Sequence, residues 1–376
     1  MAMTRVYLVR HGEAEGNVYR RLQGQYNSKL TPNGLVQLER LRERCASLPL
    51  DAVYASNLRR AWMTAQAVVG GRDIPLVPEL RFQEMYLSEW EDVTFGFLAK
   101  QGGTQWDLFM KDDPAFSLSK SETFPQVARR ASIALQGILE KHEGGSVAVV
   151  SHGLCLSMLA RALLGEQAKE LGHLDNASLS CLLVGEGRVE LEFWSDNAHL
   201  GELSTLAKQS WWRKNPTVPD MNLWYRPVDL QTEEGIALAI QRRAWYSVYN
   251  TYEYFSAEGA LEAYREMART NPRCVQFVML EDTIVGLLLL NQELWKPDNG
   301  HIALICLEES YQNMGLGIQL IGEAVSYFRR QGKKTLTLRV WPQNGRAMRF
   351  YARAGFEKTG TYPGSFGPLD VLRLEL

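Results

Sequence analysis

The sequence predicts an α/β protein with two domains, and three observations lead to this expectation. The chain has 376 residues, more than one ordinary domain contains. Strand-like and helix-like segments alternate through its first half, which predicts a doubly wound, three-layer α/β/α domain. The periodicity then fails between Leu203 and Asp220, where Trp211, Trp212 and two prolines indicate a connector. We therefore expect domains over residues 1–203 and 222–376, joined by a connector over residues 204–221.

Apolar runs and their breaks predict the elements of the first half. Short runs rich in Val, Tyr and Leu are typical of buried strands, and longer runs with helical spacing predict helices. The expected strands are Arg5–Val9, Ala52–Ala55 and Val147–Val150, and the expected helices are Asn33–Ala46, Leu58–Val69, Phe124–Lys141 and Leu154–Leu164. Two further strands, Ser178–Val184 and Arg188–Trp194, are separated by Gly185-Glu186-Gly187 and predict a hairpin at the edge of the sheet.

A second series of elements begins with a strand at Leu223. We expect a strand at His301–Leu307, a helix at Ile318–Gln331 and a strand at Thr335–Val340. The loop before the helix carries two glycines that allow close backbone approach, and a helix N-terminus presents free N–H groups. This combination predicts an anion-binding cradle. The loop residues are Gln312, Asn313, Met314, Gly315, Leu316 and Gly317.

Composition narrows the class of protein. The net charge of −2 argues against a general nucleic-acid binder, which needs a basic surface. The most apolar stretch, Thr283–Leu290, is too short to span a membrane. The N-terminus lacks a signal-peptide pattern, and the five cysteines are scattered without a CxxC pair. We expect a cytoplasmic protein with small-molecule substrates, no metal, and no nucleic-acid or membrane partner.

Two short stretches far apart in the sequence carry residues suited to one phosphate site. Arg10-His11-Gly12-Glu13 and Ser151-His152-Gly153 each follow a predicted buried strand. In parallel sheets, ligands bind at the carboxyl ends of the strands. Guanidinium groups match phosphate oxygens, and a neutral imidazole can attack phosphorus. The two stretches therefore predict a positively charged pocket with a nucleophile.

These stretches resemble the histidine phosphatase superfamily, the relatives of cofactor-dependent phosphoglycerate mutase. The resemblance covers about the first 200 residues, and the motifs occur in the family's order. They are Arg10–Glu13 with Asn17, then Gln23-Gly24 with Leu30–Gly34, then Tyr54–Ala61 with Thr64-Ala65, and finally Ser151–Gly153.

The resemblance implies a role for each matching residue. His11 would attack phosphorus and form a phosphohistidine, with its other ring nitrogen held by a backbone carbonyl. Arg10 and Arg60 would bind the phosphate, and His152 would donate to the transferring phosphoryl group. The residues that match the family's substrate-binding positions are Asn17, Gln23 and Gly24.

The proton donor to the leaving group is expected to be Glu84, which stands where the family places an acid. Glu89 and Glu91 are its competitors. The domain is short and its Glu84 segment resembles phosphatases, so we expect hydrolysis, with a phosphoglycerate mutase-type transfer as the alternative. Ala14 replaces a frequent Ser or Thr and leaves the substrate open. Residues Asp92–Ser121 would supply the substrate pocket, and their aromatic side chains suit either an organic phosphate or a helix core: Phe95, Phe97, Trp106 and Phe109.

The second half resembles the GNAT N-acetyltransferases, through the loop at residues 312–317 and the run from Asn344 to Phe356. The resemblance implies a mixed, mainly antiparallel sheet and acetyl-CoA as co-substrate, bound by the loop and by Asn344. Tyr351 would protonate the departing CoA thiolate. We therefore expect a bifunctional enzyme, a phosphatase and N-acetyltransferase.

Two features of the acetyl-acceptor site stay open. The general base is Glu308, Glu309, His301 or ordered water. The aromatic residues at helical spacing (Trp245, Tyr249, Tyr252) either line an acceptor pocket or form a core stripe. As an alternative to catalysis, this domain binds acyl-CoA and regulates the phosphatase.

Overall fold

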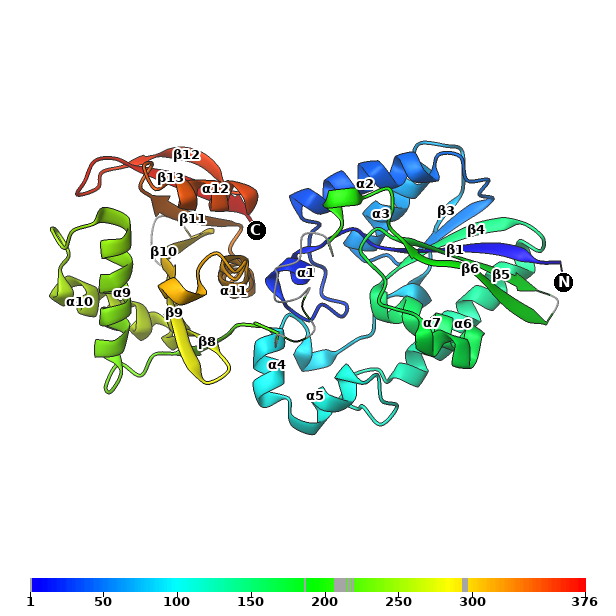
Figure 1. Cartoon of the computed structure of the whole chain (residues 1–376), viewed down its shortest axis with the longest axis horizontal. Coiled ribbons are helices and arrows are strands. Elements are labelled where there is room, and N and C mark those ends of the chain that lie inside the picture. The colour runs from blue at the N-terminus through cyan, green and yellow to red at the C-terminus, as the bar shows by residue number, and fades with distance from the viewer. Residues whose placement is uncertain (1, 186, 206–214, 216, 218–219, 293–296) are drawn as a thin grey trace. The chain divides into compact units, whose positions relative to one another are not determined.

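The computed structural model describes residues 2–185, 187–205, 215, 217, 220–292 and 297–376. The chain divides into two compact units, residues 1–93 with 101–209 and residues 94–100 with 210–376 (Figure 1). Most of the connector predicted at residues 204–221, including Trp211 and Trp212, lies outside the described residues. The grouping of residues 94–100 with the second unit differs from the predicted boundaries.

The first unit contains a six-stranded sheet of order β3-β2-β4-β1-β5-β6. Its strands are β1 (Thr4–Arg10), β2 (Ala52–Ala55), β3 (Leu76–Pro78), β4 (Ser146–Ser151), β5 (Leu179–Gly185) and β6 (Arg188–Asp196). The first four in spatial order are parallel, and β5 and β6 form the predicted antiparallel hairpin at the edge. The central strands β1, β2 and β4 are almost fully buried, in agreement with their continuous apolar runs.

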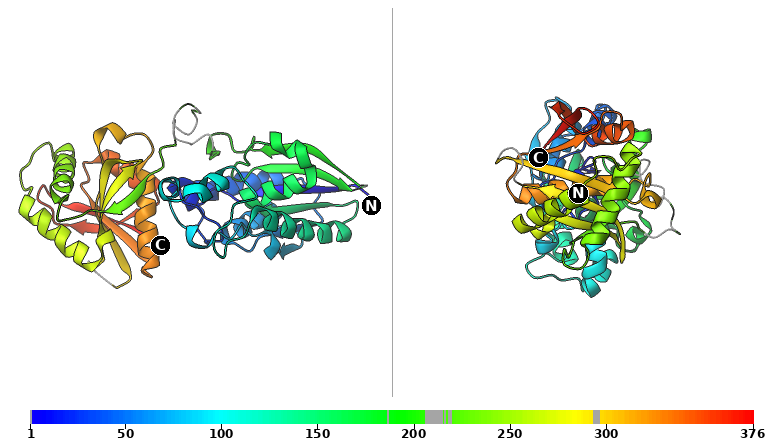
Figure 2. Two further views of the ribbon diagram at one scale, coloured as in Figure 1. Left: turned by 90° about the horizontal axis from the view of Figure 1, so that it is seen from below. Right: turned by 90° about the vertical axis from the view of Figure 1, so that its left-hand side faces the viewer.

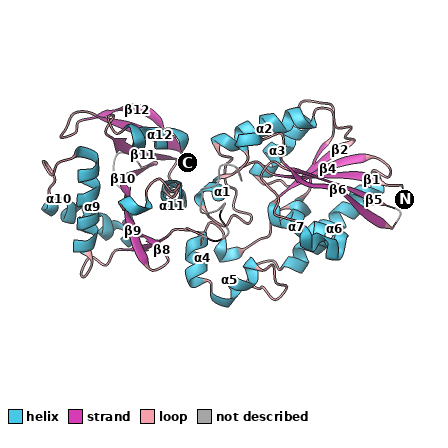
Figure 3. Ribbon diagram, in the orientation of Figure 1, coloured by secondary structure: helices cyan, strands magenta, loops and turns pink. Residues whose placement is uncertain are grey.

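Helices cover both faces of this sheet. Figures 1 and 3 show α2 and α3 together on one face and α6 and α7 on the other. The helices are α1 (Glu15–Tyr19), α2 (Pro32–Cys45), α3 (Arg59–Val69), α5 (Gly103–Met110), α6 (Phe124–Lys141) and α7 (Gly153–Leu164), and α4 (Phe95–Gln101) follows β3 in the chain. Helix α2 begins where Thr31 accepts the N–H of Gly34 and Pro32 occupies the first turn. The three-layer α/β/α prediction is confirmed.

The second unit contains a seven-stranded sheet of order β12-β13-β11-β10-β9-β8-β7. Among its described pairs only β10 and β11 are parallel, so the mixed, mainly antiparallel sheet is confirmed. The strands are β7 (Trp224–Pro227), β8 (Val275–Leu280), β9 (Thr283–Asn291), β10 (Asn299–Leu307), β11 (Thr335–Val340), β12 (Glu357–Tyr362) and β13 (Leu369–Glu375). Figures 1 and 2 show α9 (Glu234–Tyr249) and α10 (Ala257–Thr270) on one side of this sheet and α11 (Gly317–Arg330) on the other; α12 is Gly345–Arg353.

Two further features of the structure concern the cysteines and the apolar character of the helices. All five cysteines carry free thiols, and four of them are buried. Among the described residues, no helix has both the length and the apolar character needed to cross a membrane.

Candidate active sites

The two predicted histidine motifs meet at the carboxyl ends of β1 and β4. These strands are parallel neighbours, and Arg10 is paired with Ser151 in their register. The residues that follow are therefore brought together: the ring centroids of His11 and His152 lie 5.2 Å apart. The backbone N–H of His11 donates to the Ser151 carbonyl at 3.0 Å. Both imidazoles are buried.

The ring of His11 has one defined tautomer. Its Nδ1 lies 2.7 Å from the carbonyl oxygen of Gly12, and because a carbonyl only accepts, Nδ1 must carry the hydrogen. The lone pair then lies on Nε2. Burial lowers the pKa of His11 well below its ordinary value, and Arg60 and Arg10 lower it further. His11 is therefore a neutral imidazole with a free Nε2, which is the form a nucleophile requires.

The ring of His152 is held at the opposite nitrogen. Its Nε2 lies 2.8 Å from Oγ of Ser56, whereas its Nδ1 is buried with no hydrogen-bond partner among the described residues. Burial lowers the pKa of His152 well below its ordinary value, followed by the effects of Arg60, His11 and Arg10. An unsatisfied buried polar atom at a site of this kind indicates a position for a ligand atom.

Two guanidinium groups surround the histidines. Arg60, in the first turn of α3, is buried, and its Nη1 and Nη2 donate to the carbonyls of Tyr26 and Gly24 at 2.8 and 2.7 Å. Burial lowers the pKa of Arg60 to about 10, while Glu84 raises it, so the group stays charged at neutral pH. Arg10 donates to the Leu174 carbonyl and lies against Gly153. Buried positive charge next to a neutral nucleophile suits an anion such as a phosphate dianion.

Glu84 lies at the N-terminus of α7, the helix whose N-cap residue is His152. Its carboxylate accepts the N–H groups of Cys155 at 3.0 Å, Leu154 at 3.2 Å and Met85 at 3.0 Å. Glu91 is also partly buried, and burial raises its pKa. Its Oε1 accepts the N–H groups of Gln25 and Leu87. Glu89 is exposed. Both Glu84 and Glu91 act electrostatically on Arg60, so the geometry keeps two candidates for the acid.

In the second unit, strands β10 and β11 diverge beside the glycine-bearing loop. They pair only from Asn299–Thr335 to Ile302–Leu338, although β10 continues to Leu307 and β11 to Val340. The loop then leads into α11, whose first N–H groups have no partner within the helix. Gly315 has a φ of +77°, a conformation that residues with a Cβ rarely adopt. The glycine conformation and the helix start are those that the predicted pyrophosphate cradle requires, and binding of a pyrophosphate at this loop stays a prediction.

Tyr351 on α12 is buried beside this sheet. Its ring packs between Phe350 and Phe356, at centroid distances of 5.2 and 5.7 Å. Burial raises the pKa of the phenol, and nearby Cys306 on β10 raises it further, so Tyr351 retains its proton.

Comparisons with known proteins match a family to each half of the chain. A family model described as "Histidine phosphatase superfamily (branch 1)" matches residues 6–197, which is just over half of the chain. The chain belongs to the histidine phosphatase superfamily. A second model, described as "Acetyltransferase (GNAT) family", matches residues 237–356, so a GNAT domain is fused to the phosphatase domain.

The curated relatives that match the histidine phosphatase domain include proteins named as mutases and a protein named as a phosphatase. The chain is 34% identical to the "Probable phosphoglycerate mutase GpmB" of Serratia proteamaculans, over 47% of this chain and 84% of the relative. It is 31% identical to the "Metal-independent phosphoserine phosphatase" of Arabidopsis thaliana, over 55% of this chain and 87% of the relative. The solved structure "Bacillus stearothermophilus YhfR" is 32% identical with a TM-score of 0.50, over 52% of this chain and 99% of that one.

The predicted substrate-binding residues of the histidine phosphatase domain make internal contacts that shape the site. Asn17 accepts from Ala14 N–H at 2.9 Å and from the Asn176 amide at 3.3 Å. Gln23 accepts from the Ser28 hydroxyl. The carbonyl of Gly24 orients Arg60. Gly24 therefore contacts Arg60, a predicted phosphate-binding residue, and contact of any of the three with a substrate stays a prediction.

Sequence reasoning missed two supports of the histidines. Ser56 follows β2, whose last residue Ala55 pairs with Val150, so the strand register that joins His11 to His152 also brings Ser56 to His152. The amide of Asn176 donates to the His11 carbonyl at 3.1 Å. The signal for Ser56 was its place directly after a predicted strand, and Asn176 had no local signal.

The aromatic residues of the segment 92–121 favour the helix-core interpretation. Trp106 and Phe109 are buried and stack on each other, with ring centroids 5.9 Å apart. Both also contact Trp90. Phe97 is grouped with the second unit, and its ring centroid lies 6.5 Å from that of Trp224 in the same unit. Trp106 and Phe109 are therefore packed as the helix-core alternative expects, and a role of the segment in substrate binding stays a prediction.

In the GNAT domain, the predicted cofactor-binding residue and the candidates for the general base have different surroundings. Asn344 caps α12 by accepting the Ala347 N–H at 3.1 Å. Glu308 pairs with Arg243 at 2.5 Å. His301 is buried in the paired half of β10, with Nδ1 3.1 Å from the Thr337 hydroxyl, and burial followed by Arg339 lowers its pKa to about 4.

The aromatic stripe of α9 continues into neighbouring loops. Trp245 packs on Tyr249 at 4.6 Å, and Tyr249 stacks on Phe366 at 4.6 Å, whereas Tyr252 contacts Tyr246. Trp245 and Tyr249 are only partly buried, so these aromatic side chains are not part of a fully buried core.

Proposed function

We propose that the chain catalyses two reactions: hydrolysis of phosphomonoesters through a phosphohistidine on His11, and acetyl transfer from acetyl-CoA to an amine. The observation that carries the first proposal is the hydrogen bond from Nδ1 of His11 to the Gly12 carbonyl. It leaves Nε2 unprotonated beside Arg10 and Arg60, so a nucleophile and its phosphate clamp share one buried pocket.

The first half-reaction forms a nitrogen–phosphorus bond. Nε2 of His11 attacks phosphorus while the bond to the ester oxygen breaks. Arg10 and Arg60 neutralise the phosphoryl oxygens, and His152 donates to one of them through Nδ1 if Ser56 donates to its Nε2. Glu84, in its protonated form, gives its proton to the leaving oxygen. In the second half-reaction, water attacks phosphorus while the bond from phosphorus to Nε2 of His11 breaks, Glu84 takes the proton of that water, and inorganic phosphate leaves.

Hydrolysis is preferred over a mutase reaction because the domain is short, and the phosphoserine phosphatase relative supports a phosphomonoester hydrolase. The relatives named probable phosphoglycerate mutases keep the alternative open. The two are separated by product analysis. Serine phosphate and 3-phosphoglycerate are suitable probes: release of inorganic phosphate supports the proposal, and an isomeric phosphoglycerate without phosphate release favours the mutase.

Replacing Glu84 by glutamine should slow esters with poor leaving groups selectively. We expect kcat/KM for serine phosphate to fall by about 10²–10⁴-fold, because loss of a general acid removes a contribution of this size. Nitrophenyl phosphate, whose leaving group hardly needs a proton, should lose much less in the first half-reaction. Glu91→Gln is the matched control. If Glu91→Gln shows the selective loss instead, Glu91 is the acid, and equal losses on both esters in Glu84→Gln make Glu84 structural.

The pH dependence of kcat/KM should lack a histidine ionisation near 6.5, the ordinary imidazole value. Burial and the two arginines lower the pKa of both histidines, so each stays neutral well below pH 6.5. Because kcat/KM reports the free enzyme and the free substrate, the profile from pH 5.5 to 8 should reflect the phosphate ester, whose second pKa is about 6. A limb near 6.5 that moves in His152→Asn would contradict this.

The acetyl-transfer proposal rests on the loop before α11 and on Tyr351. The positive φ of Gly315 and the first turn of α11, which has no side-chain cap, fit a pyrophosphate group. Acetyl-CoA would supply the acetyl group, and the protonated phenol of Tyr351 would supply a proton to the thiolate. The general base stays open between Glu308, Glu309, His301 and water. If the domain binds acetyl-CoA but acetylates no amine, the regulatory alternative is favoured.

A further inference from the structure

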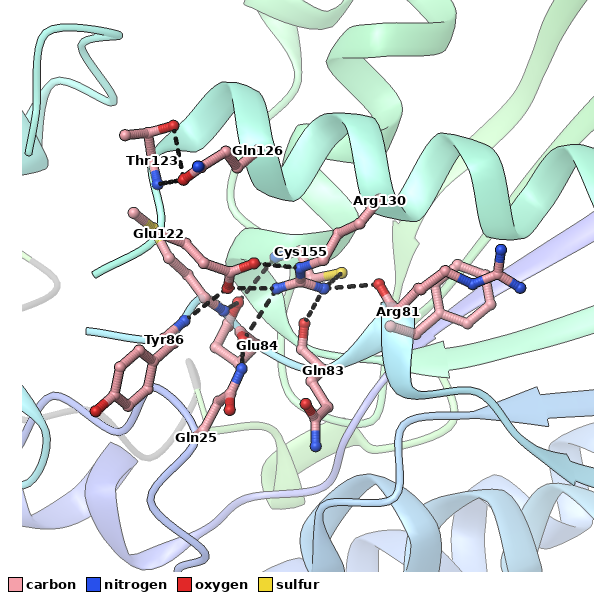
Figure 4. Close-up of polar contacts among 12 residues, drawn as sticks. Gln25, Arg81, Gln83, Glu84, Tyr86, Glu122, Thr123, Gln126, Arg130 and Cys155 are labelled. Carbon is pink, nitrogen blue, oxygen red and sulfur yellow. Dashed lines mark hydrogen bonds and ion pairs between the residues drawn. The ribbon is translucent and has the colours of Figure 1, made fainter. Parts of the chain in front are cut away.

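One partly buried arginine near the proposed acid uses all of its hydrogen-bond donors. Arg130, on α6, has five N–H hydrogens, and each has an acceptor (Figure 4). Nε donates to Oε1 of Glu122 at 2.7 Å, and Nη2 donates to Oε2 of Glu122 at 3.0 Å. The remaining three hydrogens go to backbone carbonyls of one loop: Arg81 at 2.6 Å, Gln83 at 2.7 Å and Glu84 at 3.1 Å.

Glu122 completes the attachment of the loop. Its Oε2 accepts the N–H of Tyr86 at 2.9 Å, and its own N–H donates to the Tyr86 carbonyl at 2.9 Å. The side chains of Arg130 and Glu122 are only 18% and 24% exposed. Because the pair is bidentate and shielded, it holds its geometry better than a surface ion pair does.

The same loop is fixed from the side of the histidines. Oγ of Ser151, the residue before His152, donates to the Phe82 carbonyl at 2.6 Å. The carbonyls of residues 81, 82, 83 and 84 are therefore all engaged, three by Arg130 and one by Ser151. Glu84 extends from this loop to the N-terminus of α7.

We propose that Arg130 is a positioning residue that fixes the Glu84 carboxyl group for proton transfer, with Glu122 as its anchor. This rests on the proposed role of Glu84 as the acid. Without Arg130, the carbonyls of Arg81 and Gln83 lose this partner and the Glu84 carbonyl keeps only the Gln25 amide, so the loop relaxes toward water. Proton transfer needs the donor within hydrogen-bond reach of the leaving oxygen, so a shift of about 1 Å is enough to cost about 10²-fold in rate.

The test compares two esters in four variants: Arg130→Met, Arg130→Lys, Glu122→Gln and the control Arg129→Met, an exposed neighbour on the same helix. We expect Arg130→Met to lower kcat/KM for serine phosphate by about 10²-fold and that for nitrophenyl phosphate much less. Arg130→Lys should recover part of the loss, because an ammonium group keeps the charge but offers three donors and no planar fork. Arg129→Met should match the wild type on both esters.

A double-mutant cycle separates positioning from general stability. If Arg130 acts through Glu84, adding Arg130→Met to Glu84→Gln should produce little further loss on serine phosphate. Circular dichroism and thermal melting establish that each variant is folded at the assay temperature. If Arg130→Met does not fold, Arg130→Lys and Glu122→Gln carry the same comparison.

Two outcomes would overturn the proposal: equal losses on both esters in the folded Arg130 and Glu122 variants, or a full additional loss in the Glu84→Gln background. The Glu84→Gln single variant reports separately on the proposed function. If it shows the leaving-group selectivity and the Arg130 variants do not, Glu84 is the acid and Arg130 does not position it. If it shows none, the acid assignment itself is wrong.

Discussion

The His11→Ala variant is expected to lose phosphatase activity by at least about 10⁴-fold, the scale of loss when a covalent nucleophile is removed. The physical reason is that His11 supplies the unprotonated Nε2 beside Arg10 and Arg60, whereas His152 is proposed to donate through Nδ1. Nδ1 of His11 binds only its neighbour Gly12, so the fold should tolerate the change. Initial rates with serine phosphate and nitrophenyl phosphate measure the effect.

The control for His11→Ala is His173→Ala, because His173 is an exposed histidine of the same unit. It should retain wild-type rates. Thermal melting of both variants establishes that they are folded. A folded His11→Ala protein with a near wild-type rate would show that phosphorus is attacked by another group or directly by water.

Replacing Gly315 by valine should lower acetyl-CoA affinity by about tenfold or more. A branched residue disfavours a φ of +77° by about 1–2 kcal/mol. Binding bears this cost because the loop must hold this conformation around the co-substrate, and 1.4 kcal/mol corresponds to tenfold in affinity. The added side chain also blocks approach of the backbone to a pyrophosphate. Isothermal titration calorimetry with acetyl-CoA measures the change.

The matched control lies at the other end of the same helix. Gly332, just after α11, has a φ of +72° and open space around it. Gly332→Val should therefore introduce comparable backbone strain without changing acetyl-CoA affinity. Equal affinity losses in both variants would trace the effect to strain in α11. An unchanged affinity in Gly315→Val would show that the loop does not hold the co-substrate.

Tyr351→Phe separates chemistry from binding in the same experiment. It removes one hydroxyl group, so acetyl-CoA affinity should stay close to the wild-type value while thiol release with an active amine slows. Normal transfer by Tyr351→Phe would assign the proton to another group.

The sequence predicts most of the fold because its signals are local. The helix Phe124–Lys141 and the strand Thr335–Val340 have the predicted bounds, since apolar periodicity and end signals act within each segment. The short elements α1 and β3 were missed because they are too brief for a periodic pattern. The aromatic residues Trp106 and Phe109 show the limit of composition, which does not distinguish a pocket wall from a core.

The site is predicted in part for the same reason. Arg10, His11 and His152 follow strands directly, so strand register alone places them together. The contacts that orient them join distant segments. Asn176 reaches His11 across 165 positions, and Arg130 reaches Glu84 across 46. No pattern within one segment reports such pairs, because they depend on how helices and loops pack around the sheet.

The most direct test of the phosphohistidine is to trap it. The enzyme is mixed with ³²P-labelled nitrophenyl phosphate and quenched rapidly in base, in which a nitrogen–phosphorus bond survives. Wild type and Glu84→Gln are both used, because Glu84→Gln should form the intermediate and hydrolyse it slowly. The account predicts covalent label approaching one per chain in Glu84→Gln, lost in acid, located on His11 by mass spectrometry and absent from His11→Ala. Turnover without covalent label in either protein, or label that persists in His11→Ala, would contradict it.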